Sequence, residues 1–167
     1  EKNKKHIDRG WILAELASSY YFLEEYENAI IYFEKLIEEN LFDENDFYNS
    51  LTYYKYAYSL SEDTNRLKDA IKYAEIHINL LHKNEDYEFY EDAVYLLSWL
   101  YEENKNAKKL ISLLENSIDI DKDNYFYYNK LYLVFSDGRF GIKQDQKRAF
   151  EYLLRAEGLN SPFILNN

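Results

Sequence analysis

Apolar residues recur at intervals of three and four along nearly the whole chain of 167 residues, with short polar runs between the stretches. This spacing places apolar side chains on one face of an α-helix, and no stretch keeps the strict alternation of a half-buried β-strand. The sequence therefore predicts an all-α fold with eight helices, over residues 5–23, 26–40, 47–61, 66–82, 86–103, 106–119, 124–136 and 144–158. Because the connections are short, successive helices are expected to pack antiparallel as hairpins.

The hairpins repeat one order of small and large residues. The first copy comprises Leu16, Ala17, Tyr20, Tyr26, Ala29 and Phe33. Ala17 and Ala29 are small where two helices cross closely, and the larger side chains, Leu16 among them, are expected to fill the adjoining space. This order resembles a tetratricopeptide repeat, and it returns around Ala57 and Ala70 and more weakly around Ser98 and Ala107.

The fourth hairpin differs, because its loop carries Gly138, Gly141 and Asp145. Glycines adopt the positive φ angles that a wide loop needs, and an aspartate directly before a helix caps it. This pattern resembles a Sel1-like repeat. The proline that often ends a tetratricopeptide repeat is missing, so the helices are expected to rely on caps such as Asp46 and Asp123.

The resemblance implies a right-handed α–α superhelix of about four hairpins in one domain, residues 1–167. The repeats would span residues 5–40, 47–82, 86–119 and 124–158. Residues 159–167 contain Ser161-Pro162, a typical helix start, and are expected to open a further or capping helix. Trp11 is expected to cover the first hairpin, and exposed terminal repeats would favour self-association.

The formal net charge of −11 excludes the usual mode of nucleic-acid binding, which draws on lysines and arginines that neutralise phosphates. The carboxylates are spread along the chain, and we interpret them as a solvated surface, with a site for a basic partner as the alternative. No run approaches the ~18 apolar residues of a membrane helix, so direct membrane insertion is not expected. The sequence does not indicate a compartment.

No group of residues matches a catalytic or metal site. The chain has no cysteine, and His6, His77 and His82 do not form an HExxH motif. Gly138 and Gly141 are not followed by the GK[ST] of a phosphate loop, and paired carboxylates such as Glu38 and Glu39 lie at a polar helix end. We expect neither enzymatic activity nor a cofactor or metal.

The resemblance implies that the first helix of each hairpin lines the binding surface. The corresponding residues are Ala14, Ser18, Tyr21, Phe22, Tyr54, Lys55, Tyr58, Tyr95, Trp99 and Asn129. Ala14 and Ser18 stand where carboxylate-gripping members of the family have lysine and asparagine, so that clamp is not expected. The row is instead aromatic, which is typical of binding hot spots, although 19% aromatic content leaves packing as the alternative.

Two functions follow from these residues. The first is an interaction scaffold that binds a peptide or partner protein in an aromatic groove. The alternative is a regulatory or targeting module of a longer enzyme or bacterial envelope protein.

Overall fold

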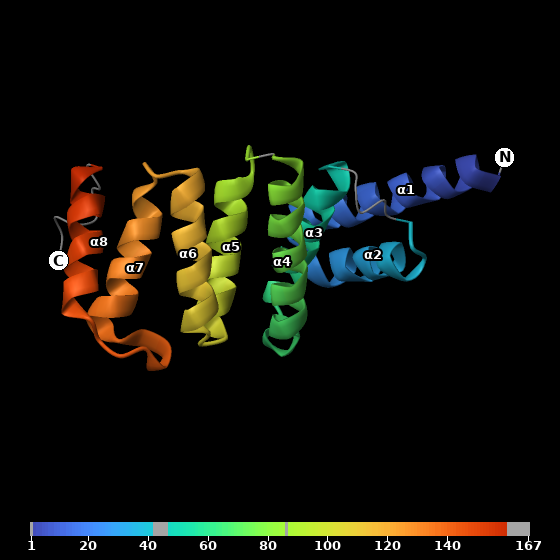
Figure 1. The fold of residues 1–167 in the computed structure, drawn as a ribbon. Coiled ribbons are helices and arrows are strands. Elements are labelled where there is room, and N and C mark those ends of the chain that lie inside the picture. Colours follow the sequence, from blue (N-terminus) through green and yellow to red (C-terminus); the bar gives the residue numbers. More distant parts are fainter. Residues whose placement is uncertain (1, 42–46, 86, 160–167) are drawn as a thin grey trace. The chain divides into compact units, whose positions relative to one another are not determined.

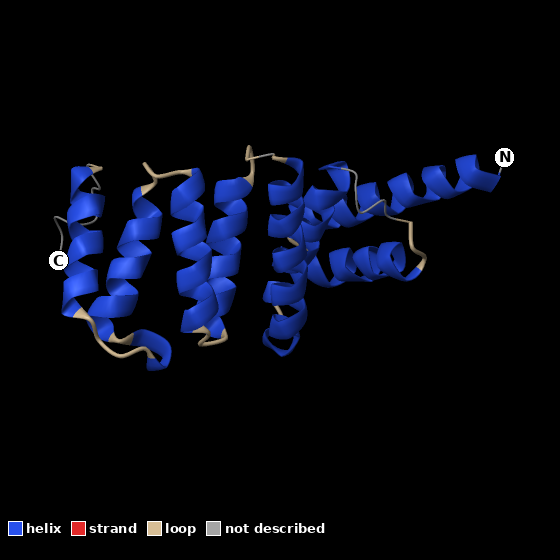
Figure 2. Ribbon diagram, in the orientation of Figure 1, coloured by secondary structure: helices blue, strands red, loops and turns tan. Residues whose placement is uncertain are grey.

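The computed structural model describes residues 2–41, 47–85 and 87–159, except for the side chains of residues 2–8 and 47–49. Within this part the chain forms helices and loops and no β-strand (Figure 2). The predicted all-α class is confirmed. The expected cap Asp46 and the expected helix start Ser161-Pro162 lie outside the described residues.

The helices follow the predicted ranges closely. Their bounds are α1 (Lys2–Phe22), α2 (Tyr26–Glu38), α3 (Phe47–Ser61), α4 (Leu67–Asn84), α5 (Tyr90–Glu103), α6 (Ala107–Ile120), α7 (Tyr125–Asp137) and α8 (Gln146–Gly158), with 3₁₀ turns η1 (Thr64–Arg66) and η2 (Arg139–Gly141). The largest difference is at α5, which begins at Tyr90 and not at residue 86. Its first turn is preceded by a tight turn in which the Tyr90 amide donates to the carbonyl of Tyr87.

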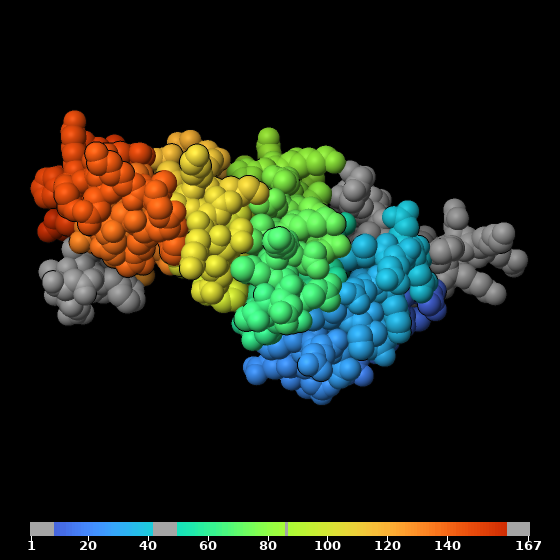
Figure 3. Space-filling view, turned by 90° about the horizontal axis from the view of Figure 1, so that it is seen from below, coloured from blue at the N-terminus to red at the C-terminus, as the bar shows by residue number. Residues whose placement is uncertain are grey.

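The chain divides into two compact units, Glu1–Leu100 and Tyr101–Asn167. In the first unit, α1 packs antiparallel with α2 and α3 with α4, and α3 also contacts α1 and α2 (Figure 1). In the second unit, α7 packs with α6 and with α8. Side chains of the first unit, blue to green, form a continuous surface in the space-filling view (Figure 3).

The small residues predicted for the helix crossings are buried. Ala17 and Ala29 are fully buried, as are Ala57 and Ala70 in the second hairpin. Phe33 is also fully buried and packs beside the Tyr56 ring, with 5.5 Å between ring centroids. The burial expected at the predicted crossing positions is therefore observed.

Two predictions for α1 are wrong. Leu16 is 39% exposed, and Leu13, which is four residues before Ala17 and so on the same helix face, is buried in its place. Trp11 is 66% exposed, so its ring does not cover the first hairpin.

The caps of α7 and α8 test a second set of predictions. Asp145 caps α8 as expected, because its Oδ1 accepts from the Arg148 amide at 3.0 Å. Asp123 does not cap α7. Asn124 immediately precedes the first helical residue, and its Oδ1 accepts from the Phe126 amide at 3.1 Å.

Backbone with positive φ ends several helices. Gly138 and Gly141 have φ of 68° and 80°, as the loop pattern predicts. Elsewhere the chain uses non-glycine residues for the same purpose: Glu24, Glu85 and Lys105 have φ of 60°, 51° and 52°. These left-handed residues, and not prolines, stop α1, α4 and α5.

A candidate binding surface on the first helices

Seven of the predicted binding residues lie on α1 and α3, and the structure brings several of their side chains into contact across the two helices. The Lys55 ammonium donates to Ser18 Oγ at 3.0 Å and lies 4.9 Å from the centre of the Phe22 ring. The Tyr21 ring meets the Tyr58 ring edge-on, with 5.6 Å between centroids. These contacts join residues 37 positions apart in the sequence into one cluster.

Partial burial shifts the pKa values of side chains in this cluster. Burial lowers the pKa of Lys55, and the Glu15 carboxylate opposes the shift. Burial, followed by Asp92 and Tyr58, raises the pKa of Tyr54 to about 12, and burial likewise raises the pKa of Tyr21. The phenols are therefore neutral donors at physiological pH, and the Lys55 charge is already directed at α1.

Next to this cluster, α3 and α5 enclose a hollow of about 320 Å³. We call it the aromatic hollow. It is lined by Tyr54, Tyr58, Ser61, Glu62, Asp92, Tyr95, Leu96 and Trp99. Tyr95 and Trp99 are 37% and 41% exposed, so their rings remain accessible. Four predicted binding residues from two helices thus line one concave site within the first unit.

Two carboxylates in the lining, Glu62 and Asp92, were missed by the sequence reasoning. For Asp92, helical spacing could have indicated its place in the lining. On α5, Asp92 precedes Tyr95 by three residues and Trp99 by seven, which places all three on one helix face. The Asp92 charge also contributes to the raised pKa of Tyr54, as expected for a carboxylate that faces this ring.

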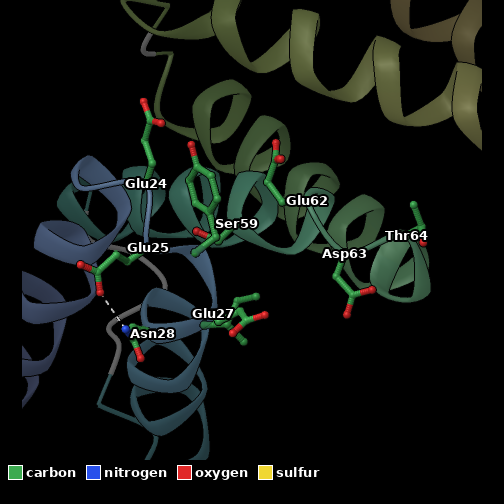
Figure 4. Close-up of a pocket in the computed structure, with 10 residues that line it drawn as sticks. Glu24, Glu25, Glu27, Asn28, Ser59, Glu62, Asp63 and Thr64 are labelled. Atoms are coloured by element: carbon green, nitrogen blue, oxygen red, sulfur yellow. Dashed lines mark hydrogen bonds between the residues drawn. The ribbon is translucent and has the colours of Figure 1, made fainter.

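A second, larger hollow of about 750 Å³ adjoins the first, since Glu62 lines both. We call it the acidic trough. Figure 4 shows its lining, which comes from the α1–α2 turn, the start of α2, the end of α3 and the connection from α3 into η1: Glu24, Glu25, Tyr26, Glu27, Asn28, Ile30, Ser59, Glu62, Asp63 and Thr64. The Glu25 carboxylate accepts a hydrogen bond from the side-chain amide of Asn28 at 2.8 Å. Among the residues whose side chains the structure describes, no lysine or arginine lines this trough or the aromatic hollow.

His77 of α4 lies behind the aromatic hollow. It is 1% exposed, and its ring centroid is 5.5 Å from that of Tyr54. Neither ring nitrogen has a hydrogen-bond partner within the part of the chain that the structure describes. Burial lowers the pKa of His77 to about 4, an effect that the Ser50 backbone partly opposes, so the imidazole is neutral at physiological pH.

The remaining two positions of the predicted row are Ala14 and Asn129. Ala14 lies on α1 and is half-buried. Asn129 lies on α7 in the second unit and is also half-buried. The role of Asn129 in binding stays a prediction.

No group of histidines and carboxylates in the described part of the chain is arranged to hold a metal ion. None of its helices combines the length and the apolar character needed to cross a bilayer. What the surface offers is aromatic area, hydroxyl groups and carboxylates.

Comparison with solved structures shows the fold. A chain described as "MamA RS-1 ArsTM double mutant" superimposes with a TM-score of 0.66 at 20% sequence identity, over 90% of this chain and 75% of that chain. At this identity the likeness shows a helical-repeat fold of the tetratricopeptide type, which the sequence predicts. No protein-family model and no curated protein gave a match.

Proposed function

We propose that this chain is a protein-interaction scaffold that binds a peptide or a segment of a partner protein on the first helices of its hairpins. The observation that carries the proposal is the aromatic hollow, because it places Tyr54, Tyr58, Tyr95 and Trp99 around one accessible concavity. Helical-repeat proteins bind through such surfaces, and tyrosine and tryptophan dominate binding hot spots.

The size of the hollow is sufficient for one or two side chains of a partner. Its 320 Å³ is at the lower end of the roughly 300–1,000 Å³ typical of small-molecule sites. A partner segment that inserts one or two side chains there and extends over the cluster of α1 and α3 would use both parts of the surface. The helical-repeat fold of the structural neighbour supports a non-enzymatic role.

A selection from a random peptide library, displayed on phage and panned on the purified chain, tests the proposal. Recovered peptides are titrated against the parent and Trp99→Ala, with Trp11→Ala as the matched control because Trp11 is exposed on α1 and outside the hollow. We expect Trp99→Ala to weaken binding about 30-fold, the equivalent of ~2 kcal/mol for a hot-spot ring, and Trp11→Ala to leave it unchanged.

Tyr58→Ala provides a second ring variant, with Glu38→Ala and Glu39→Ala as exterior acidic variants. Each is checked for folding by circular dichroism, because Tyr58 also packs on Tyr21. Peptides that bind all the folded ring variants as tightly as the parent would refute the groove.

Two finer assignments belong to the same proposal. The fourth hairpin is Sel1-like, which its positive-φ glycines and the Asp145 cap support. Self-association through the terminal repeats is tested by light scattering over a range of concentrations, where a constant monomer mass would count against it.

A further inference from the structure

The aromatic hollow combines two features that recognise the same chemistry. The rings of Tyr54, Tyr58, Tyr95 and Trp99 have electron-rich faces, and the carboxylates of Glu62 and Asp92 stand among them. A cation over an aromatic face is attracted by the ring quadrupole, most strongly by tryptophan. A guanidinium or ammonium group in the hollow would contact the aromatic ring faces and the carboxylates at the same time.

These carboxylates have no competing counter-ion. Within the described residues, neither Glu62 nor Asp92 forms an ion pair, and the lining of the hollow contains no lysine or arginine. Lys55, the cation among the predicted binding residues, is directed instead at Ser18 and the Phe22 ring on α1. The hollow therefore carries uncompensated negative charge.

The acidic trough extends this charge in one direction. Glu24, Glu25, Glu27 and Asp63 line it together with Glu62, and none of the five forms an ion pair with a described basic residue. Burial first, and then neighbours that include the Glu24 and Glu62 carboxylates, raise the pKa of Tyr26 at this site. Some carboxylates outside the trough are paired, as Glu34 is with Arg66 at 2.9 Å and Glu102 with Lys130 at 2.8 Å.

We infer that the aromatic hollow receives an arginine or lysine side chain of a partner protein, and that further basic residues of the same segment lie over the acidic trough. The inference rests on the proposed function and specifies its partner as a basic segment. An arginine suits the hollow best, because its guanidinium stacks on aromatic rings and its fork of donors matches a carboxylate.

The test uses capped glycine-rich peptides that carry one arginine, with a citrulline peptide as the neutral isostere. In the Trp11→Phe variant Trp99 is the one remaining tryptophan, so its indole N–H gives a single ¹⁵N NMR signal at the hollow. We expect the arginine peptide to shift this signal saturably and the citrulline peptide to do so at least ~3-fold more weakly. Equal shifts from both peptides would overturn the inference.

Variants of the lining separate the two parts of the site. Asp92→Asn should weaken the one-arginine peptide by about 2- to 5-fold, as expected for one exposed ion pair, while Glu38→Gln, which lies outside both hollows, should leave it unchanged. A second and third arginine should each tighten binding by a similar factor. Combined Glu24→Gln and Glu27→Gln should reduce this gain and leave the one-arginine affinity intact. If the added arginines give no gain in the parent, the trough has no part in binding.

Other outcomes are distinguishable from failure of the scaffold function. Library peptides that need Trp99 but lack basic residues, together with no response to the arginine peptide, would leave the scaffold standing and reject the basic partner. If tetramethylammonium shifts the Trp99 signal and the arginine peptide does not, the hollow accepts a small quaternary ammonium ion and the inference is also rejected.

Discussion

His77 should make the stability of the first unit dependent on pH. The imidazole is buried beside Tyr54, and burial holds its pKa at about 4 in the folded chain, against an ordinary value near 6.5. Between these two values the unfolded chain binds more protons than the folded chain, so folding weakens as the pH falls. The stabilisation is complete above pH 6.5 and is lost progressively down to pH 4.

The size of this effect follows from the two pKa values. A difference of about 2.5 units corresponds to roughly 3 kcal/mol over the whole window. At about pH 5, an unfolded chain with pKa 6.5 is almost fully protonated at this site and the folded chain is not, which gives a loss of about 2 kcal/mol relative to pH 7.5.

The matched variant is His77→Leu, which fills a similar volume and does not titrate. Urea unfolding followed by far-ultraviolet circular dichroism, at about pH 7.5 and about pH 5, gives the free energy of unfolding of both chains. Titration of the carboxylates contributes equally to the pH dependence of the parent and of the variant. The difference between the two chains therefore isolates the contribution of His77. A parent that responds to pH in the same way as His77→Leu would show that the imidazole is not buried in its neutral form.

Two further predictions concern the loop and cap of the last hairpin. Gly138→Ala should destabilise the chain by ~1–2 kcal/mol, because φ is 68° and the added Cβ would lie 2.9 Å from the Ile142 carbonyl oxygen, whereas Gly158→Ala meets no atom within 4 Å and should be nearly neutral. Asp145→Ala should cost about 1 kcal/mol through loss of the α8 cap, and Asp123→Ala should cost little, since Asn124 caps α7. Urea midpoints measure both pairs, and a control as destabilised as its partner would contradict the assignment.

Local pattern predicts most of this fold. Helical periodicity needs only neighbouring residues, and the small residues at the crossings, such as Ala17 and Ala29, are recognisable because close packing of helices requires them. The start of α5 was misplaced because Tyr87 and Phe89 continue the apolar pattern into a tight turn. Whether Asp123 or Asn124 caps α7 depends on the residue at which the helix begins. Both residue types are good caps, so their capping propensities do not fix this start to within one residue.

The candidate site was only partly predictable. The aromatic rings follow from their positions on the first helices, but the two carboxylates that line the aromatic hollow could not be selected from so many. Whether a carboxylate is paired with a basic residue depends on contacts between residues that are far apart in the sequence. Arg66 bonds to Glu34 over 32 positions, and Arg148 bonds to Glu115 over 33. The sequence left a solvated surface and a site for a basic partner as alternatives, because it does not reveal which carboxylates are paired.

The division into paired and unpaired carboxylates predicts opposite responses to salt. Salt screens exposed charges beyond about 8 Å at 0.15 M, so added sodium chloride should weaken the attraction between the acidic trough and a basic peptide. The same screening relieves repulsion within a chain of net charge −11, and it should raise the free energy of unfolding.

Combined Glu24→Gln and Glu27→Gln separates these effects from general influences of salt on folding. With two unpaired charges removed from the trough, the variant should be more stable than the parent at low salt and should gain less stability as salt is added. Its affinity for a peptide with three arginines should also depend less on salt. Peptide titrations and urea unfolding at about 0.05 and 0.5 M sodium chloride measure both quantities. If the variant and the parent respond identically, the trough carboxylates act as ordinary solvated charges and do not form a focused acidic surface.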